Sequence, residues 1–144
     1  TRDLSDAELE RIGQPNPSTI SVDAASNATN GKWEYRGVIT DSGTELFRVG
    51  PHPEGSNNIG EFLALVHGLA WLKEQRSDIA IYSDSRIAMS WVKQKKAKPK
   101  KAGIKSRQLI ARAEAWLKAN TYSNPILKWE TKVWGEIPAD FGRK

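Results

Sequence analysis

The 144-residue sequence contains no cysteine, which excludes a disulfide framework and is compatible with a reducing compartment. It also lacks any apolar run near the roughly 20 residues that a membrane-spanning helix needs. The first twenty residues are polar and acidic, without the apolar core of a secretory signal. We therefore expect no membrane partner and a cytoplasmic location.

Histidine is scarce, and neither of the two histidines is a good candidate for catalysis. His52 lies between prolines in an expected loop, and His67 lies in the middle of an expected helix.

The N-terminal region has the pattern of a tether. The spacing of Ser5 and Glu8 is typical of a capping box, and Gly13 suits a C-cap, so we expect a helix over residues 6–12. A Pro-rich linker follows. We predict a tether over residues 1–17 and one domain over residues 18–144. Because the first residue is Thr, we also expect the chain to be a piece of a longer protein.

Positive charge prevails over negative charge, with a net charge of +5 and a pI near 9.5. This balance favours a polyanionic partner. The lysines gather between Lys93 and Lys101, a stretch without any acidic residue. The alternative interpretation of this stretch is a solvated, mobile loop.

Alternating and β-rich segments predict five strands. The first three follow one another through polar turns, one of them at residues 41–44, so they should form an antiparallel meander. The fourth and fifth are separated by helical segments, which favours parallel pairing. The strand segments are Ile20–Asp23, Trp33–Ile39, Leu46–Val49, Ile79–Tyr82 and Ile126–Trp129.

Helical periodicity predicts three main helices. In Phe62–Lys73 the apolar residues fall on one stripe, Ile87–Val92 is a shorter segment, and Leu109–Leu117 marks a long amphipathic helix. We also expect at least one helical turn in Glu136–Lys144. The fold class is therefore α/β, with a mixed five-stranded sheet flanked by helices.

Four carboxylates occupy informative places in this order. Asp23 is on the first strand, Glu61 opens the first long helix, Asp84 ends the fourth strand, and Asp140 lies near the C-terminus. If strands one and four are neighbours, Asp23 and Asp84 converge at adjacent strand ends, and Glu61 can face them.

Carboxylates held so close together repel one another unless a cation compensates their charge. Hard divalent cations such as Mg²⁺ prefer these ligands, and two of them can promote hydrolysis of a phosphodiester. Each acid also has an ordinary alternative. Asp84 could be a helix N-cap, Glu61 a first-turn acid, and Asp140 a surface residue.

At these positions the sequence resembles the type 1 ribonuclease H family. The matching motifs are Ser-Val-Asp at 21–23, Ser-Asn-Asn-Ile-Gly-Glu-Phe-Leu-Ala at 56–64 and Tyr-Ser-Asp-Ser at 82–85. The tail at 128–131 and 134–144, including Trp-Gly-Glu-Ile-Pro-Ala-Asp-Phe-Gly-Arg-Lys, resembles one bacterial branch. The resemblance runs from about Ser18 to the end of the chain.

The resemblance implies a ribonuclease H-like fold and cleavage of the RNA strand of an RNA/DNA hybrid, with 5′-phosphate and 3′-hydroxyl ends. It implies that Asp23, Glu61, Asp84 and Asp140 hold two Mg²⁺ ions, which Mn²⁺ can replace. Most of the wider family has a histidine in a loop before the last aspartate, and this sequence has none there. The resembled branch instead has a glutamate at the position of Glu136, credited with metal exchange and product release. An exposed acid at a helix start is the simpler interpretation of Glu136.

The resemblance also implies a set of contacts with the substrate. Asn57 and Asn58 match asparagines that contact both strands in the minor groove, and Trp91 matches a tryptophan that lines the channel for the DNA strand. A core aromatic is the alternative for Trp91, and a loop or N-cap role is the alternative for Asn58. The remaining implied contacts are Ser26, Ser56 and Arg86. The usual glycine-rich stretch after the first aspartate is replaced here by 24–31, so we do not count Ala28 and Thr29 among the implied RNA contacts.

Two other functions fit parts of the pattern. An integrase- or resolvase-like DNA nuclease shares the acid-bearing core but lacks the Asn-Asn pair before the helix glutamate. An inactive hybrid- or RNA-binding module would tolerate loss of the acids, and all four are present. We expect a monomer, because no apolar stripe is left over for an interface.

Overall fold

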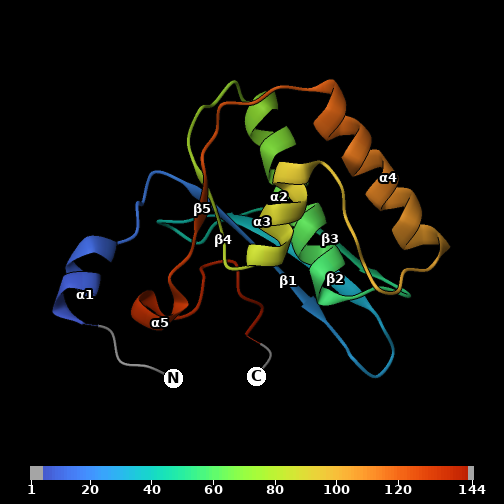
Figure 1. Ribbon diagram of the computed structural model, residues 1–144, viewed down its shortest axis with the longest axis horizontal. Coiled ribbons are helices and arrows are strands. Elements are labelled where there is room, and N and C mark those ends of the chain that lie inside the picture. Colours follow the sequence, from blue (N-terminus) through green and yellow to red (C-terminus); the bar gives the residue numbers. More distant parts are fainter. Residues whose placement is uncertain (1–4, 143–144) are drawn as a thin grey trace.

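The computed structural model describes residues 5–142 and folds into a five-stranded sheet with helices packed on it (Figure 1). The strands are β1 (Ile20–Ser26), β2 (Trp33–Ile39), β3 (Glu45–His52), β4 (Ile81–Ser83) and β5 (Ile126–Lys128). The helices are α1 (Asp6–Ile12), α2 (Asn57–Glu74), α3 (Arg86–Gln94), α4 (Ile104–Ala119) and α5 (Thr131–Trp134). The α/β class and the mixed sheet predicted from the sequence are confirmed.

The strand order in space is β3-β2-β1-β4-β5. The first three strands pair antiparallel, because short turns join them, one closed by the Gly31 N–H to Asn27 carbonyl bond and one by the Gly43 N–H to Ile39 carbonyl bond. Strand β4 pairs parallel with both β1 and β5, since helices separate it in sequence from its neighbours. Strand β1 is therefore central and has an antiparallel partner on one side and a parallel partner on the other.

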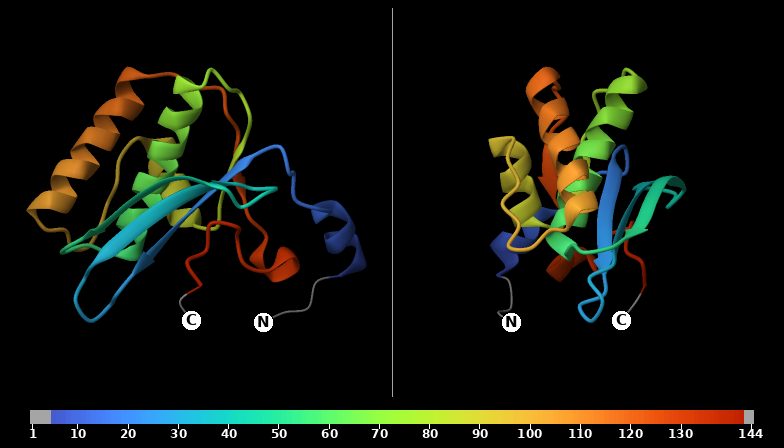
Figure 2. Two further views of the ribbon diagram at one scale, coloured as in Figure 1. Left: turned by 180° about the vertical axis from the view of Figure 1, so that it is seen from behind. Right: turned by 90° about the vertical axis from the view of Figure 1, so that its right-hand side faces the viewer.

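Helices α2, α3 and α4 lie on one face of the sheet, as the side view in Figure 2 shows. Helix α2 is in the middle of this layer, and its neighbours bury it on most sides. Its buried residues are Ile59, Gly60, Glu61, Phe62, Leu63, Ala64, Leu65, Val66, Gly68, Leu69 and Leu72. The apolar stripe expected for this helix is buried, and burial extends beyond it because the helix packs against helices as well as against the sheet.

Close approach of α2 to β1 depends on a glycine. A Cβ atom added at Gly60 would lie 2.8 Å from the Cβ of Ala24, which is closer than real side chains pack. The absence of a side chain there lets the helix backbone come near the strand. The neighbouring residue, Glu61, is thereby placed against the sheet although it belongs to a helix.

The N-terminal helix begins with the expected capping box. The Ser5 hydroxyl accepts from the Glu8 N–H, the Glu8 carboxylate accepts from the Ser5 N–H, and the C-cap is Gly13. The segment that follows contacts the domain, since Trp134 Nε1 donates to the Gly13 carbonyl and the Asn16 N–H donates to the Tyr82 hydroxyl. The boundary at residue 17 stays a prediction.

Two local expectations were wrong. Residues 136–142 form no helix, and the last helix is α5, four residues that the sequence pattern did not indicate. The final two residues of the resembled tail lie outside the described part of the chain. His52 is the last residue of β3 rather than part of a loop, and its ring packs 5.1 Å from that of Trp33.

The helices within residues 5–142 are short or polar relative to what a bilayer crossing needs. None of them combines sufficient length with sufficient apolar character.

Candidate active site

Three of the predicted carboxylates come together at one edge of the sheet. Asp23 is on β1, Glu61 is on α2, and Asp84 lies between β4 and α3. One oxygen of each lies within 4.8 Å of the others. The convergence of strand ends expected from the sequence is therefore what the structure shows for these three residues.

The short length of β4 opens this edge. Strand β4 pairs with β1 only at Ile20 and Ser21, so β1 continues past it without a strand neighbour on that side. The N–H of Ala24 faces the resulting gap and donates to Oε1 of Glu61. Glu61 lies one turn inside α2, not at its first residue as expected, and the helix delivers its carboxylate to the strand.

Asp84 owes its place to the start of α3. Ser85, not Asp84, is the N-cap of that helix, and its hydroxyl accepts from the Ala88 N–H at 3.1 Å. The capping alternative for Asp84 is therefore wrong. Its carboxylate is left to face the other two acids at the end of β4.

Burial is the main influence on the pKa values of the site. Burial, together with the nearby charges of Asp84 and Asp140, raises the pKa of Asp23 to about 6, although the Glu61 carboxyl and the Ala24 N–H partly oppose the rise. Burial also raises the pKa of Glu61 well above its usual value, and Asp23 adds to this effect. The site therefore favours protons or cations over bare negative charge.

The donor set fits a hard divalent cation. Oε2 of Glu61 is buried, and no N–H or O–H group among residues 5–142 donates to it. A buried carboxylate oxygen in this position is costly unless it carries a proton or binds a cation. With two further carboxylates within reach, the oxygen ligands are those that Mg²⁺ or Mn²⁺ prefers.

Asp140 approaches the same corner from the C-terminal segment, although it is not a member of the close group of three. Its charge acts on Asp23, and its Oδ2 accepts from the Gly142 N–H at 2.9 Å. The preceding residues Ile137 and Ala139 are buried, with exposed fractions of 2% and 0%. The structure thus brings the fourth predicted acid near the site on a segment without regular secondary structure.

Glu136 is exposed and lies in the irregular segment after α5. It does not start a helix, so the simpler interpretation of this residue as a helix-start acid was wrong. Its role in metal exchange stays a prediction.

The predicted substrate contacts differ in their surroundings. Ser56 is the N-cap of α2 without a side-chain capping bond, so the N-cap alternative for Asn58 was wrong. Asn57 is exposed and Asn58 half-buried in the first turn, one turn before Glu61. Ser26 and Arg86 are exposed at the end of β1 and the start of α3.

Trp91 is mostly a core residue. It is 8% exposed, and its ring meets that of Phe62 edge-on with 6.0 Å between centroids. The core alternative therefore describes its packing, and only a small part of the side chain remains to line a channel.

The basic segment leaves α3 and runs to the start of α4. Its lysines are exposed, whereas Ala97 is buried and its N–H donates to the Glu114 carboxylate at 2.8 Å. At the other end the Gly103 N–H donates to the Glu54 carbonyl at 2.8 Å. These two hydrogen bonds fix the backbone of the segment, so that its lysine side chains stay on the surface of the domain.

The histidines lie apart from this chemistry, as expected. His67 is hydrogen-bonded to the Tyr35 hydroxyl at 2.9 Å and its ring is stacked on Phe47, and burial lowers its pKa. Neither histidine belongs to the carboxylate group found among the described residues.

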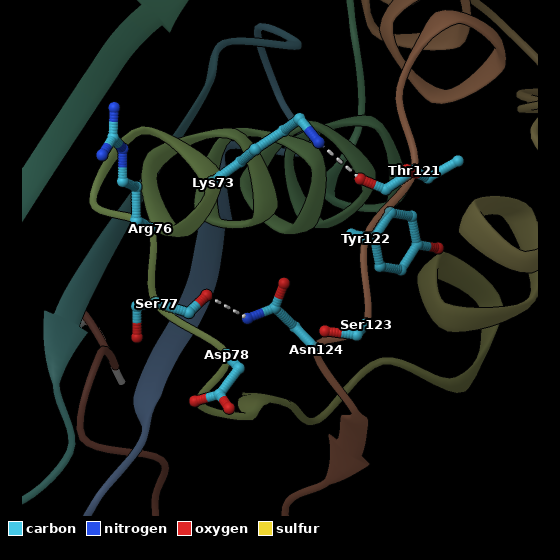
Figure 3. Close-up of a pocket in the computed structure, with 8 residues that line it drawn as sticks. All are labelled: Lys73, Arg76, Ser77, Asp78, Thr121, Tyr122, Ser123 and Asn124. Carbon is cyan, nitrogen blue, oxygen red and sulfur yellow. Dashed lines mark hydrogen bonds between the residues drawn. The ribbon is translucent and has the colours of Figure 1, made fainter.

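A pocket of about 490 Å³ lies at the opposite end of α2 from Glu61 (Figure 3). Its polar groups are engaged in holding the chain together. Lys73 Nζ donates to the Thr121 carbonyl at 2.7 Å, and the Asn124 amide donates to the carbonyls of Ser77 and Ile79. The bonds of Asn124 tie the segment before β5 to the segment before β4, and the bond of Lys73 ties the same segment to α2.

One residue near the site could not be recognised from the sequence as part of it. Arg36, on β2, contacts the segment that carries Asp140. In the sequence it is a single arginine within a strand and resembles any exposed strand residue. Only the pairing of β1 with β2 and the path of the C-terminal segment place it there.

Comparisons with known proteins agree on one family. A family model described as RNase H matches residues 15–129. Among solved structures, the LC11 ribonuclease H1 isolated from compost by a metagenomic approach has a TM-score of 0.53 at 18% identity, covering 80% of this chain and 86% of that one. The ribonuclease H1 of the halophilic archaeon Halobacterium salinarum has a TM-score of 0.51 at 18% identity, covering 77% and 83%. A second LC11 structure, in complex with an RNA/DNA hybrid, has a TM-score of 0.51 at 20% identity, covering 79% and 86%.

Proposed function

The chain belongs to the RNase H family, and from this membership together with its carboxylate group we propose that it hydrolyses the RNA strand of RNA/DNA hybrids with the help of two divalent cations. It is thus an enzyme of the ribonuclease H type. The hybrid as substrate is supported by the LC11 relative that was solved with such a hybrid. Mg²⁺ is the proposed cation, with Mn²⁺ as a substitute.

The observation that carries the proposal is the buried, unsatisfied oxygen of Glu61 between two other acids. A purely structural acid would have a donor for each buried oxygen. Here one oxygen of Glu61 accepts from the Ala24 N–H, the other has no donor among residues 5–142, and the carboxylate lies in one group with those of Asp23 and Asp84. Such an arrangement weakens the fold unless it serves to bind a cation.

In this proposal Asp23, Glu61 and Asp84 hold the cations, and Asp140 completes the set from the C-terminal segment. Bound there, the cations supply Lewis acidity for both the attacking and the leaving oxygen of a phosphodiester. The side chains themselves keep the oxygens in place. Glu61 is fixed by its bond to the Ala24 N–H, and Asp84 by the capped start of α3.

Recognition of the hybrid is assigned to the surface next to the site. Asn57 and Asn58 stand one turn before Glu61 on the same helix, so a strand held by their amides lies near the acids. Amides can donate and accept at once, which suits the base edges and 2′-hydroxyls of a minor groove. Ser26, Ser56 and Arg86 are proposed to bind sugar or phosphate groups around them.

The exposed lysines between α3 and α4 are proposed to attract the DNA strand. Cations on a surface bind phosphates without reading the bases, so we expect little sequence specificity. Trp91 lies on the helix that leads into this segment, and its exposed edge is the part available for contact with that strand.

The chemistry of the cleaved ends tests the proposed mechanism. Water attack at phosphorus gives 5′-phosphate and 3′-hydroxyl ends, so RNA fragments should be extended by a polymerase without prior phosphatase treatment. Fragments with 2′,3′-cyclic phosphate ends would contradict the proposal, because they arise from attack by the neighbouring ribose hydroxyl. A cytoplasmic location and a monomeric state stay predictions.

A further inference from the structure

Arg36 is the cross-strand neighbour of Asp23 in the pairing of β1 with β2. Because side chains alternate along a strand, Ala24 faces α2 while Asp23 and Arg36 face the other side of the sheet. The C-terminal segment runs along that other side. Arg36 is therefore the basic side chain placed between the catalytic strand and the segment that carries Asp140.

The guanidinium of Arg36 is engaged with the main chain of that segment. Nε donates to the Ala139 carbonyl at 2.8 Å, and Nη2 donates to the carbonyl of Asp140 itself. Nη1 forms an ion pair with Glu45 at 3.5 Å. The guanidinium thus bonds to two main-chain carbonyls and to Glu45. It therefore holds the C-terminal segment in place and is not a counter-ion for the carboxylates of the site.

Phe141 adds a second attachment. The guanidinium carbons of Arg36 and Arg48 lie 5.2 and 5.1 Å from the centre of its ring. Arg48 also pairs with Glu34 at 3.2 Å and with Glu45 at 3.7 Å. No hydrogen bond between Arg48 and the main chain of the segment is found among the described residues, so the two arginines differ in one definable respect.

Asp140 depends more than the other three acids on a tertiary contact to hold its main chain in place. Asp23 belongs to a strand and Glu61 to a helix, and Asp84 directly follows strand β4. Residues 135–142 form no regular element, and within the described part of the chain the local bonds of Asp140 join it to Ile137 and Gly142. Burial of Ile137 and Ala139 holds the segment on the domain, whereas Arg36 binds the peptide group of Asp140 itself.

We propose that Arg36 is a positioning residue that fixes the Asp140 main chain beside Asp23 and thereby sets the affinity of the site for divalent cations. This inference rests on the proposed function. Two parallel N–H groups in one plane match two successive carbonyls, which the single ammonium of lysine cannot imitate. Replacement by lysine therefore keeps the positive charge but removes the pair of parallel N–H donors.

The test compares Arg36→Lys with Arg48→Lys, two variants that both keep the positive charge and the neighbouring ring. Backbone hydrogen exchange at Asp140 and Gly142 is measured without metal, and Mn²⁺ binding is measured by calorimetry. Cleavage of a hybrid is then followed against Mg²⁺ concentration. Arg36→Gln is the second variant, for use if Arg36→Lys does not fold.

We expect Arg36→Lys to weaken Mn²⁺ binding about 10- to 100-fold, as loss of a residue that orients a ligand does. Exchange at the two amides should become about tenfold faster. The KM for the hybrid at saturating Mg²⁺ should stay within about twofold, since Arg36 contacts no proposed substrate residue. Arg48→Lys should match the wild type in Mn²⁺ binding and in exchange.

Wild-type Mn²⁺ affinity and wild-type exchange in a folded Arg36 variant would overturn the inference. Equal losses in the two lysine variants would do the same, because they would assign the effect to the ring contact. Failure of the wild-type chain to cleave any hybrid would contradict the proposed function instead. The exchange and Mn²⁺ measurements would still decide the role of Arg36 in that case.

Discussion

Glu61 and Asp23 face each other where β1 continues past the end of β4, with carboxylate oxygens no more than 4.8 Å apart. One comes from a helix and the other from a strand. The Ala24 N–H fixes one oxygen of Glu61, and the second oxygen is buried without a donor among residues 5–142. The free energy of this arrangement depends on whether protons or cations share the space between the two acids.

Replacing Asp84 by asparagine should abolish cleavage while leaving hybrid binding intact. The amide keeps the size of the side chain but removes one of the four carboxylates proposed to hold the cations. Loss of several kcal/mol of charge stabilisation corresponds to a decrease of about a thousandfold in kcat. Asp78→Asn is the control, because Asp78 is exposed and lines the pocket at the far end of α2. Full activity in Asp84→Asn would exclude Asp84 from the site.

The stability of the metal-free protein should fall as pH rises from about 4 to about 6. The pKa of Asp23 rises from its ordinary value of 3.8 to about 6 in the folded state, so the folded state binds the proton more tightly over this range. Ionisation of Asp23 in the folded state then costs about 3 kcal/mol above pH 6. Asp23→Asn should lose this part of the pH dependence, as measured by thermal unfolding in EDTA at pH 4, 5, 6 and 7.

The same experiment with saturating Mg²⁺ should restore stability above pH 6 in the wild type. A ligand that binds only the folded state stabilises it by about 2.7 kcal/mol at a hundred times its dissociation constant. Identical pH profiles for the wild type and Asp23→Asn in EDTA would show that Asp23 is not held in the raised-pKa environment described here.

Asn57→Ala and Asn58→Ala should each raise KM for the hybrid about fivefold, the cost of one lost hydrogen bond, with a smaller effect on kcat. Neither amide is a proposed ligand of the cations, so the substitutions should weaken hybrid binding more than they slow the cleavage step. Gln75→Ala is the matched control, since Gln75 is the exposed amide at the other end of the same helix. An unchanged KM in both asparagine variants would remove them from the substrate surface.

Replacing Lys96, Lys98 and Lys100 by glutamine should make hybrid binding weaker and less dependent on salt. For duplexes, each lost phosphate contact lowers the slope of log affinity against log salt by roughly 0.9. Lys118→Gln is the control, because Lys118 is exposed near the opposite end of α4. An unchanged slope in the triple variant would show that this segment does not contact the nucleic acid.

Much of the fold follows from local patterns. The capping box of Ser5, the alternation around Val22 and the turn near Gly43 each use short-range physics, and the corresponding elements are present. The prediction for α2 was less successful, because periodicity reveals a buried face but not how many neighbours will cover the other faces. The tail after α5 was mispredicted as helical for a related reason. Its shape is set by Ile137, Ala139 and the contacts with Arg36, all of them long-range.

The site could be predicted in part. Strand ends and helix starts indicated where Asp23, Glu61 and Asp84 would meet, and Asp140 was a fourth candidate whose place beside them no local pattern indicated. The orphan oxygen of Glu61 and the attachment of Asp140 to Arg36 could not be predicted, since both depend on how β1 meets its neighbours. For Trp91 the motif identified the residue, but it could not predict how much of the side chain is buried in the core.

The most direct test of the central claim is cleavage of one sequence prepared as RNA/DNA hybrid, RNA duplex, DNA duplex and single-stranded RNA, each with Mg²⁺ and with EDTA. We predict cutting of the RNA strand of the hybrid alone, and only with Mg²⁺. Binding of the hybrid without cutting under Mg²⁺ or Mn²⁺ would indicate an inactive binding module. Cutting of the DNA duplex would indicate an integrase-like nuclease, and either result would contradict the proposed function.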